Sequence, residues 1–449
     1  MTSEIEATAQ RARAAALELA ALPTDAKNQA LEAVRSALLR RREGIFRANR
    51  ADKNEATALA EAGKLSRPLF KRLDIEGDKF EAVLAGIGDV LRLPDPVGQV
   101  DYAMRLDEGL ELYRVRCPIG VLGVIFEARP DAAVQISTLA LKSANAVILK
   151  GGREAEQTNR ALVEAMREGI SEVKGVPPDA IQLISTREEA QAMLGLDRWI
   201  DLIIPRGSNE LVRSIQGATR IPVLGHADGL CSVYVDRKAD LHKAVKVVLD
   251  SKTQYPAVCN AAETLLLHRD VLGSAWPVLG QKLLDSNVEL RADPEARSLL
   301  PLAKPASEED FRTEFLDLIL AVKTVGSVAE AVEHINSHGS HHTDAIVTED
   351  PEAASYFLSR VDSAGVFQNA STRFADGFRY GLGAEVGVST QKTHARGPVG
   401  LEGLVIYKYR LYGKGQGVSD YGPGKRAFLH KPIGRVRASP SSVNPPHNY

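Results

Sequence analysis

The pattern of apolar and polar positions predicts helices over about the first ninety residues. Apolar side chains at Leu31, Val34 and Leu38 recur at helical spacing. The pair Thr24 and Asp25 precedes them and is typical of a helix N-terminus, because a side-chain oxygen there accepts from an exposed backbone amide. We therefore expect the chain to begin with a helical segment.

After residue 117, apolar runs with little alternation are separated by amphipathic stretches of about ten to fifteen residues. This pattern is typical of parallel strands covered by helices on both faces, a nucleotide-binding type of architecture. One such series spans residues 118–224 and another spans residues 225–396. The expected strands are VLGVIF, NAVILK, AIQLIS and DLIIP in the first series, and CSVYVD, ETLLLH, LILAVKTV and DAIVTE in the second.

Two other segments alternate in polarity like half-exposed strands. Residues 97–117 contain an Asp-Glu-Gly turn and predict a hairpin, and residues 403–413 predict a further strand. The two segments could pair with each other in one internal sheet or with a second subunit, and their exposed edges favour the second subunit. Residues 414–449 are rich in Gly, Pro, Ser and basic residues, so we expect an extended or disordered tail.

Composition and charge narrow the class of function. The 449 residues, 44% hydrophobic and 25% charged, can bury a large core, and the formal charge of −2 offers no basic surplus for nucleic acid or an anionic membrane. No apolar run reaches the roughly eighteen residues of a spanning helix. The N-terminus mixes acids and bases, unlike a signal or transit peptide. We expect small-molecule chemistry in the cytoplasm, with neither nucleic acid nor membrane as a partner.

Three cysteines are present, an odd number whose spacing fits neither a disulfide framework nor a zinc motif. Cys117 and Cys231 lie in strand-like runs and are expected to be packing residues. Cys259 instead lies in a loop between an expected helix and the strand ETLLLH. Such a loop can hold a thiol rigid and partly exposed, as a nucleophile requires. A buried inert cysteine is the alternative that the pattern leaves open.

Two turns carry residues suited to binding a nucleotide. A strand-to-helix turn could form a phosphate cradle from backbone amides, a hydroxyl and a guanidinium, although an ordinary capped turn fits equally well. It consists of Arg206, Gly207, Ser208 and Asn209. After the strand VILK, Lys150 and Arg153 could meet a ribose or its phosphate, and a solvated loop is the alternative.

Glycine-rich loops near the end of the second series contain Arg373 and Arg396, which could bind an anionic substrate or simply be solvated. The stretch GLGAEVG at residues 381–387 lacks the flanking strand and helix of a dinucleotide motif. His338, His341 and His342 lack typical metal-ligand spacing, so we expect a substrate-facing or solvated loop and no metal site.

Taken together, VILKGG, PRGSNELVRSI, GHADGLCSVYVD, YPAVCNAAETLLLH and NASTRFADGFRYGLGAEVGVST resemble the gamma-glutamyl phosphate reductases, or glutamate-5-semialdehyde dehydrogenases, of the aldehyde dehydrogenase superfamily. The resemblance covers Thr2 to Gly413 and implies an α/β fold in three parts. These are a Rossmann-like nucleotide-binding domain at 1–96 and 118–224, a catalytic domain at 225–396, and a β oligomerisation ribbon at 97–117 and 397–413.

The resemblance also implies roles for single residues. Cys259 occupies the position of the nucleophile, Lys150 that of a lysine on the adenosine ribose, and Glu314 that of a glutamate on the nicotinamide ribose. The turn at residues 206–209 stands near the pyrophosphate. Arg153 replaces an acid common in NAD-preferring relatives and so favours NADPH.

Two departures from the oxidising aldehyde dehydrogenases bear on the reaction. Gly225 stands where those enzymes have a glutamate that activates water, and Ala128 stands where they have an asparagine at the oxyanion site. A missing base suits a reductase, because water would otherwise hydrolyse the thioester before it could be reduced.

The resemblance thus implies NADPH-dependent reduction of L-glutamyl 5-phosphate to glutamate-5-semialdehyde with release of phosphate, the second step of proline biosynthesis. Alternatives are a hydrolytic or CoA-acylating relative, or a non-catalytic binding protein. The candidates for holding the substrate are Arg129, Asn369, Arg373 and Arg396. Expected partners are further copies in a dimer or tetramer and, because no kinase-sized segment precedes Thr24, a separate glutamate 5-kinase.

Overall fold

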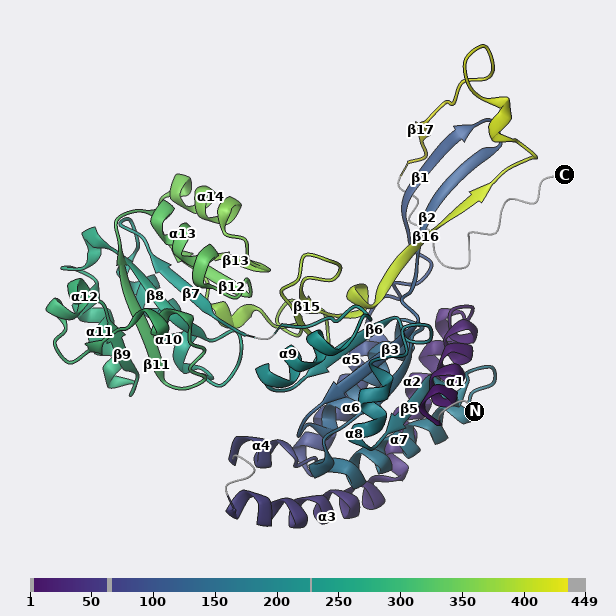
Figure 1. The fold of residues 1–449 in the computed structure, drawn as a ribbon, viewed down its shortest axis with the longest axis horizontal. Coiled ribbons are helices and arrows are strands. Elements are labelled where there is room, and N and C mark those ends of the chain that lie inside the picture. Colours follow the sequence, from purple (N-terminus) through teal and green to yellow (C-terminus); the bar gives the residue numbers. More distant parts are fainter. Residues whose placement is uncertain (1–3, 63–66, 227, 435–449) are drawn as a thin grey trace. The chain divides into compact units, whose positions relative to one another are not determined.

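The computed structural model describes residues 4–62, 67–226 and 228–434, and the chain divides into two units (Figure 1). Unit 1 comprises Met1–Leu224, Leu382–Gly387 and Val399–Tyr449. Unit 2 comprises Gly225–Gly381 and Val388–Pro398. No helix of the described residues is long and apolar enough to cross a membrane.

The core of unit 1 is a four-stranded parallel sheet in the order β5-β4-β3-β6. Its strands β3 and β4 are almost wholly buried, which explains why they read as unbroken apolar runs. Buried alanines of the first helix pack against one face of this sheet. The strands are β3 (Val121–Phe126), β4 (Ala146–Lys150), β5 (Ile181–Ile184) and β6 (Leu202–Arg206).

Helices fill the first ninety residues and the connections between these strands, as the spacing of apolar residues predicts. The N-terminal helices are α1 (Glu4–Leu19), α2 (Thr24–Arg40), α3 (Arg42–Glu61), α4 (Arg67–Arg72) and α5 (Asp78–Arg92). The connecting helices are α6 (Pro130–Lys142), α7 (Glu156–Ser171), α8 (Arg187–Met193) and α9 (Asn209–Ala218).

A four-stranded antiparallel ribbon in the order β16-β2-β1-β17 also belongs to unit 1. The strand β16 (Val405–Tyr412) pairs along its whole length with β2 (Leu110–Pro118), which forms a hairpin with β1 (Val100–Asp107). The two segments therefore pair with each other in one ribbon, as the resemblance implies, and the expectation that favoured pairing with a second subunit is wrong for the edge between β2 and β16. Eight consecutive residue pairs within one chain satisfy it.

The stretch after residue 413 also differs from the expected extended or disordered tail. It returns through a short 3-10 helix at Val418–Asp420, and β17 (Lys431–Pro432) pairs with β1. The Tyr421 hydroxyl and the Arg426 guanidinium both contact the Asp107 carboxylate, which secures this return. The rest of the expected tail, residues 435–449, lies outside the described residues.

The core of unit 2 is a seven-stranded parallel sheet in the order β10-β9-β11-β8-β7-β12-β13. Its strands are β7 (Cys231–Val235), β8 (Ala262–His268), β9 (Glu289–Ala292), β10 (Lys304–Pro305), β11 (Ile319–Val325), β12 (Thr343–Val347) and β13 (Gly365–Gln368). Its helices are α10 (Leu241–Thr253), α11 (Trp276–Asp285), α12 (Pro294–Leu299), α13 (Val328–His338) and α14 (Pro351–Arg360). Two buried sheets with connecting helices confirm the expected α/β fold class.

Candidate active site

The Cys259 thiol lies in the loop between α10 and β8, half-buried, as the sequence predicts. The next residue ties this loop to a second segment. The Asn260 amide donates to the carbonyl of Ala375 at 2.9 Å, and the Thr372 hydroxyl donates to the carbonyl of Asn260 at 2.7 Å. The thiol is therefore partly open to solvent on a fixed backbone, which suits a nucleophile.

Gly229 and Cys231, just before and at the start of β7, pack directly against Cys259. A Cβ atom on Gly229 would lie 2.3 to 2.6 Å from the carbonyl oxygen, Cα and Cβ of Cys259, so only glycine fits. The Cys231 thiol donates to the carbonyl oxygen of Cys259 at 3.2 Å. Burial raises the pKa of the Cys231 thiol well above its ordinary value, so it stays protonated and able to donate. Cys231 is buried, as a packing residue would be.

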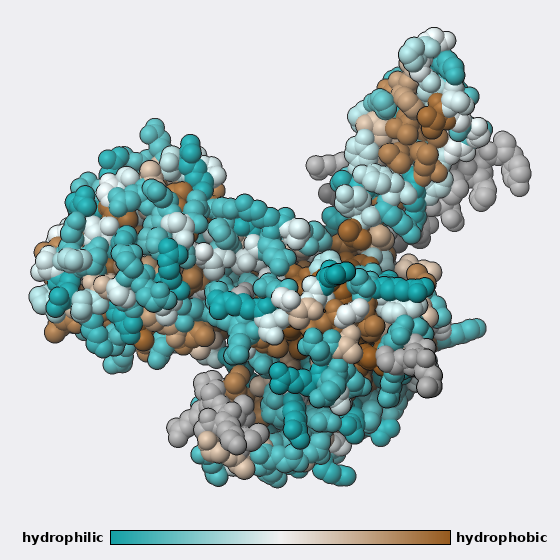
Figure 2. All heavy atoms as spheres, viewed as in Figure 1, coloured by the Kyte–Doolittle hydropathy of each residue, from teal (hydrophilic) through white to brown (hydrophobic). Residues whose placement is uncertain are grey.

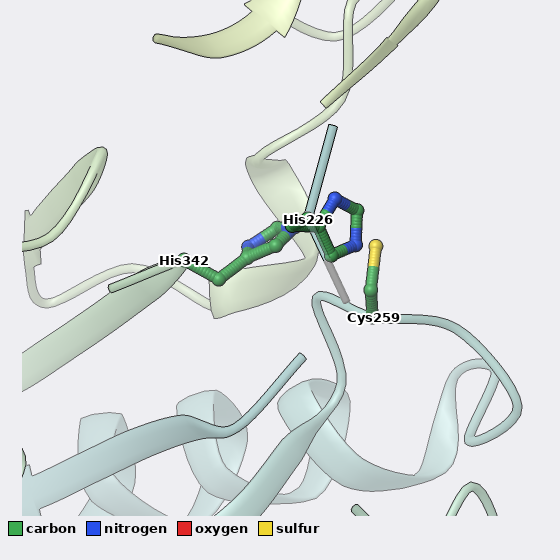
Figure 3. A group of neighbouring side chains, drawn as sticks. All are labelled: His226, Cys259 and His342. Carbon is green, nitrogen blue, oxygen red and sulfur yellow. The ribbon is translucent and has the colours of Figure 1, made fainter. Parts of the chain in front are cut away.

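Two imidazoles lie beside the Cys259 thiol, as Figure 3 shows. The ligand atoms of His226, Cys259 and His342 all lie within 4.8 Å of one another. His226 approaches the carbonyl of Val388 through Nδ1 at 2.9 Å. Because a carbonyl only accepts, Nδ1 carries the proton and the lone pair resides on Nε2. The two rings meet edge to face, with centroids 4.9 Å apart.

These histidines are the candidate site residues that sequence reasoning missed. His342 was expected in a substrate-facing or solvated loop, but it is fully buried immediately before β12. Its Nδ1 lies 3.0 Å from the Thr343 hydroxyl and 3.7 Å from the Cys231 sulfur. His226 was not singled out at all. The available signal was that each of three strands expected in unit 2 follows closely after a histidine or cysteine.

Arg373 supplies a buried positive charge near the thiol. Its side chain is 8% exposed, and Nε donates to the Gln254 side chain at 3.0 Å. Burial lowers the pKa of the Arg373 guanidinium, and Arg379 lowers it further. Cys259, Asp376 and Asp250 oppose this change. No carboxylate of the described residues forms an ion pair with Arg373, which leaves the group able to receive an anion.

The other three residues expected to hold substrate already have protein partners. Arg396 pairs with Asp362, with Nη2 3.3 Å from the carboxylate and 2.9 Å from the backbone carbonyl. Asn369 bonds to the amide and the carbonyl of Thr348, each at 2.9 Å. Arg129, in unit 1, pairs with Asp131 at 3.1 Å. Their roles stay predictions, and the geometry favours Arg373 among the four.

The residues expected to bind a nucleotide lie where adjacent parallel strands of unit 1 end. Lys150 ends β4, Arg206 ends β6, and both strands flank β3. The carboxyl edge of such a sheet is where α/β folds bind nucleotides. Arg153 lies exposed in the 3-10 helix that begins at residue 153. The nucleotide-binding roles of Lys150 and Arg153 stay predictions.

The turn after β6 leads into α9, which Ser208 caps, and a backbone amide of this turn donates to the Glu127 carboxylate. The Ser208 hydroxyl accepts from the Leu211 amide, and the Ser208 amide donates to the Glu127 carboxylate at 2.9 Å. A Cβ on Gly207 would come within 2.3 Å of the same carboxylate. These contacts match the ordinary capped turn. The phosphate-cradle role of residues 206–209, Asn209 included, stays a prediction that requires Glu127 to move aside.

Glu314 lies in a segment whose backbone is hydrogen-bonded to a buried ion pair. Lys252 Nζ lies 2.6 Å from the Glu263 carboxylate, and both side chains are buried. The other oxygen of Glu263 accepts from the Leu316 amide at 3.2 Å. Burial raises the pKa of Glu263 to about 7 against the opposing effect of Lys252, and Glu314 adds to the rise. The ion pair therefore fixes the backbone that carries Glu314.

Comparison with known proteins agrees with this fold. Residues 1–298 match the pattern of the aldehyde dehydrogenase family, and the chain belongs to this family. An acetylating aldehyde dehydrogenase from Geobacillus thermoglucosidasius has the same fold, with a TM-score of 0.63 over 92% of this chain and 97% of that one at 18% identity.

More similar relatives narrow the assignment within the family. The chain is 55% identical to the gamma-glutamyl phosphate reductase of Synechococcus sp. (strain JA-3-3Ab) over 96% of this chain and 94% of the relative. The crystal structure of the gamma-glutamyl phosphate reductase from Thermotoga maritima has a TM-score of 0.89 at 39% identity, covering 92% of this chain and 99% of that one. The chain thus belongs to the gamma-glutamyl phosphate reductases, which confirms the expected resemblance.

Replacing Gly229 with alanine should displace Cys259, because the new methyl group would overlap backbone atoms of that residue. We expect the rate of iodoacetamide labelling at Cys259, measured by peptide mass spectrometry, to fall at least about tenfold in Gly229→Ala. Gly273→Ala is the matched control, since a Cβ there meets nothing within 4 Å. Equal labelling rates in both variants would contradict the role of Gly229 in positioning Cys259.

Proposed function

We propose that this chain reduces L-glutamyl 5-phosphate to glutamate-5-semialdehyde, with release of phosphate, through a thioester on Cys259. The reaction would be the second step of proline biosynthesis. The observation that carries the proposal is the fixed, half-buried Cys259 thiol beside His226 and near Arg373. Membership of the gamma-glutamyl phosphate reductases supports the identity of the substrate.

His226 is suited to handle the proton of the nucleophile. Its Nε2 lone pair accepts the thiol proton of Cys259, and the thiolate attacks the acyl carbon of the substrate. The carbon–oxygen bond to phosphate breaks, and the proton held on His226 passes to the departing phosphate. When bound, NADPH supplies the hydride that reduces the thioester, and cleavage of the carbon–sulfur bond then releases the aldehyde and the Cys259 thiolate.

Gly225 keeps this chemistry directed toward reduction. A carboxylate at that position would activate water against the thioester, as in the oxidising relatives, whereas glycine supplies no base. Ala128 likewise supplies no side-chain donor for the oxyanion, so we assign that role to the backbone amide of Cys259. The protein retains the acyl group on Cys259 until a hydride reaches it.

Arg373 is suited to bind the phosphate of the substrate. That phosphate is attached to the carbon that Cys259 attacks, so it must lie close to the thiol. Arg373 is the candidate whose charge acts on Cys259 and which has no carboxylate partner among the described residues. A guanidinium forms strong, paired hydrogen bonds with phosphate oxygens.

The cofactor preference rests on Lys150 and Arg153, which present two positive charges at the end of β4. We assign the 2′-phosphate of NADPH to Arg153, the adenosine ribose to Lys150 and the nicotinamide ribose to Glu314. A cytoplasmic location and contact with a separate glutamate 5-kinase also stay predictions.

The outer edge of β16 is suited to join copies of the chain. Figure 2 shows hydrophobic residues gathered on the ribbon. On β16, the large side chains of Tyr407, Tyr409 and Leu411 are 49%, 57% and 57% exposed. They alternate along one face of a strand at the end of the sheet. An exposed, apolar edge strand of this kind pairs readily with another chain. We therefore propose a homo-oligomer joined through the ribbon.

The reverse reaction tests the proposed chemistry. Reduction of NADP⁺ by pyrroline-5-carboxylate, the cyclised semialdehyde, should require inorganic phosphate and should be lost in Cys259→Ser, because serine is a far weaker nucleophile. Cys117→Ser, which alters a cysteine of the ribbon, should keep its activity. Activity without phosphate would indicate a hydrolytic enzyme, and dependence on coenzyme A an acylating one. Equal efficiency with NAD⁺ would contradict the cofactor assignment.

The role of Arg373 can be separated from a structural one by the KM values. Arg373→Ala should raise the KM for inorganic phosphate roughly 10- to 100-fold, the loss expected for hydrogen bonds to a charged group. The KM for NADP⁺ should be unchanged. The KM for phosphate of Arg373→Lys should lie between the native value and that of Arg373→Ala. Arg360→Ala is the control, since that arginine stacks on Tyr356 at the surface of α14. A KM for phosphate that does not change would exclude Arg373 from the phosphate site.

Oligomerisation through β16 can be measured by light scattering. The double variant Tyr409→Lys and Leu411→Lys should have a lower molar mass than the native protein, because two buried like charges would oppose pairing of the strands. Leu302→Lys, which alters a residue of unit 2 that is 74% exposed, should leave the mass unchanged. A monomeric native protein, or a double variant of native mass, would contradict the proposal.

A further inference from the structure

We propose that His226, Cys259 and His342 form a binding site for a zinc ion, and that occupation of the site inhibits the enzyme. Zinc binding itself follows from the three side chains, whereas inhibition rests on the proposed role of Cys259 as nucleophile. The three ligand atoms lie within 4.8 Å of one another (Figure 3). Thiolate and imidazole are the ligands that zinc favours in proteins.

The orientation of both imidazoles suits metal binding. The bond from His226 Nδ1 to the Val388 carbonyl at 2.9 Å is the arrangement that commonly orients a metal-binding histidine and leaves Nε2 as the ligand. His342 Nδ1 contacts the Thr343 hydroxyl at 3.0 Å, and this hydroxyl can accept from Nδ1 when Nε2 binds a metal. In His342 the ring nitrogen not occupied by this contact is Nε2.

The His342 Nε2 atom is an independent sign of a ligand. It belongs to a side chain that is 0% exposed, and it has no hydrogen-bond partner in the described part of the chain. A buried polar atom without a partner carries a desolvation penalty, so such atoms are rare in proteins and call for a specific explanation. Coordination to a cation would satisfy this lone pair.

Only a small movement is needed to bring the ligands into place. Tetrahedral zinc, with bonds of about 2.0 to 2.3 Å, requires its ligand atoms to lie about 3.5 Å apart. The largest separation here is below 4.8 Å, so the three atoms must converge by about 1 Å. His226 and Cys259 are only half-buried and can adjust, whereas His342 is fixed in the core.

Binding would remove the nucleophile from the reaction. The sulfur–hydrogen bond of Cys259 breaks, its proton passes to solvent, and a sulfur–zinc bond forms without any change in oxidation state. The lone pair of His226 that would otherwise accept the thiol proton is also taken up. The fourth position of the ion remains open to water or phosphate. Zinc should therefore exclude iodoacetamide and substrate from the same thiol.

Cobalt(II) provides a spectroscopic probe of this site, because it occupies zinc sites and gives a thiolate charge-transfer band in the near ultraviolet. We expect native protein to bind one cobalt ion with this band and zinc to displace it. The band should be lost in Cys259→Ser. His342→Asn retains a polar group near Thr343 but deletes Nε2, and it should weaken zinc binding at least about tenfold, the loss caused even by changes around a metal's ligands.

The controls separate this site from adventitious surface binding. His338→Gln, in the same histidine-rich segment but outside the cluster, should bind zinc as the native protein does. His342→Gln provides a second substitution if His342→Asn is unstable by its melting temperature. Zinc should also block iodoacetamide labelling of Cys259, and EDTA should restore it. Cobalt binding without a thiolate band, or equal affinity in the native and His342 variants, would overturn the site.

Inhibition is measured separately from binding. If the proposed activity is present, zinc should abolish it at the concentration that blocks labelling of Cys259, and EDTA should restore it. Zinc bound at the cluster of an enzyme that stays fully active would overturn the inhibitory role. If the protein shows no activity of the proposed kind, the cobalt band and the labelling assay still decide whether the metal site exists.

Discussion

The parallel pairing of β7, β8 and β12 is the constraint on which the candidate active site depends. These strands are direct neighbours in the sheet, and Val233 of β7 is registered against both Leu265 of β8 and Ala345 of β12. Parallel neighbours begin at the same edge of a sheet, so the loops that precede them meet there. Each loop contributes one side chain to the group of His226, Cys259 and His342.

The same pairing explains why the two cysteines of unit 2 differ in character. Cys231 begins β7 in the core, where burial keeps its thiol protonated and able to donate to the Cys259 carbonyl. Cys259 lies outside the strand that follows it, so it is partly exposed and adjoins an imidazole. Gly229 gives the two segments room to approach. Reactivity is therefore assigned by position relative to the strand ends and not by residue type.

Much of this arrangement could be predicted from local sequence, because strand and helix periods are local properties. The parallel strands, the helical beginning and the loop position of Cys259 all follow from such patterns. Strand order is not local, and without it His226 and His342 could not be placed beside Cys259. The short strand β9 was missed because its Glu289 and Arg291 pair with each other in a polar pattern atypical of a buried strand.

Pairing between segments distant in sequence was equally difficult to predict. The alternation of polar and apolar residues in β16 is compatible with pairing to the exposed edge of any sheet, whether in the same chain or another. Only the register with β2, such as Tyr409 opposite Arg114, shows that the partner belongs to the same chain. Likewise, composition alone could not show that the stretch rich in Gly and Pro returns to β1 through β17.

Lys252 and Arg373, two buried cations near the end of α10, differ in how their charges are balanced. Lys252 is neutralised by Glu263, and the pair also bonds to the Leu316 amide, so its electrostatic requirements are met within the fold. Arg373 donates to the neutral Gln254 side chain and, among the described residues, has no carboxylate within ion-pair distance, although Asp376 and Asp250 act on it from further away. A buried charge without a counterion destabilises the folded state. Because an anionic substrate would offset that cost only while it is bound, this setting suits the phosphate-binding role that we propose for Arg373.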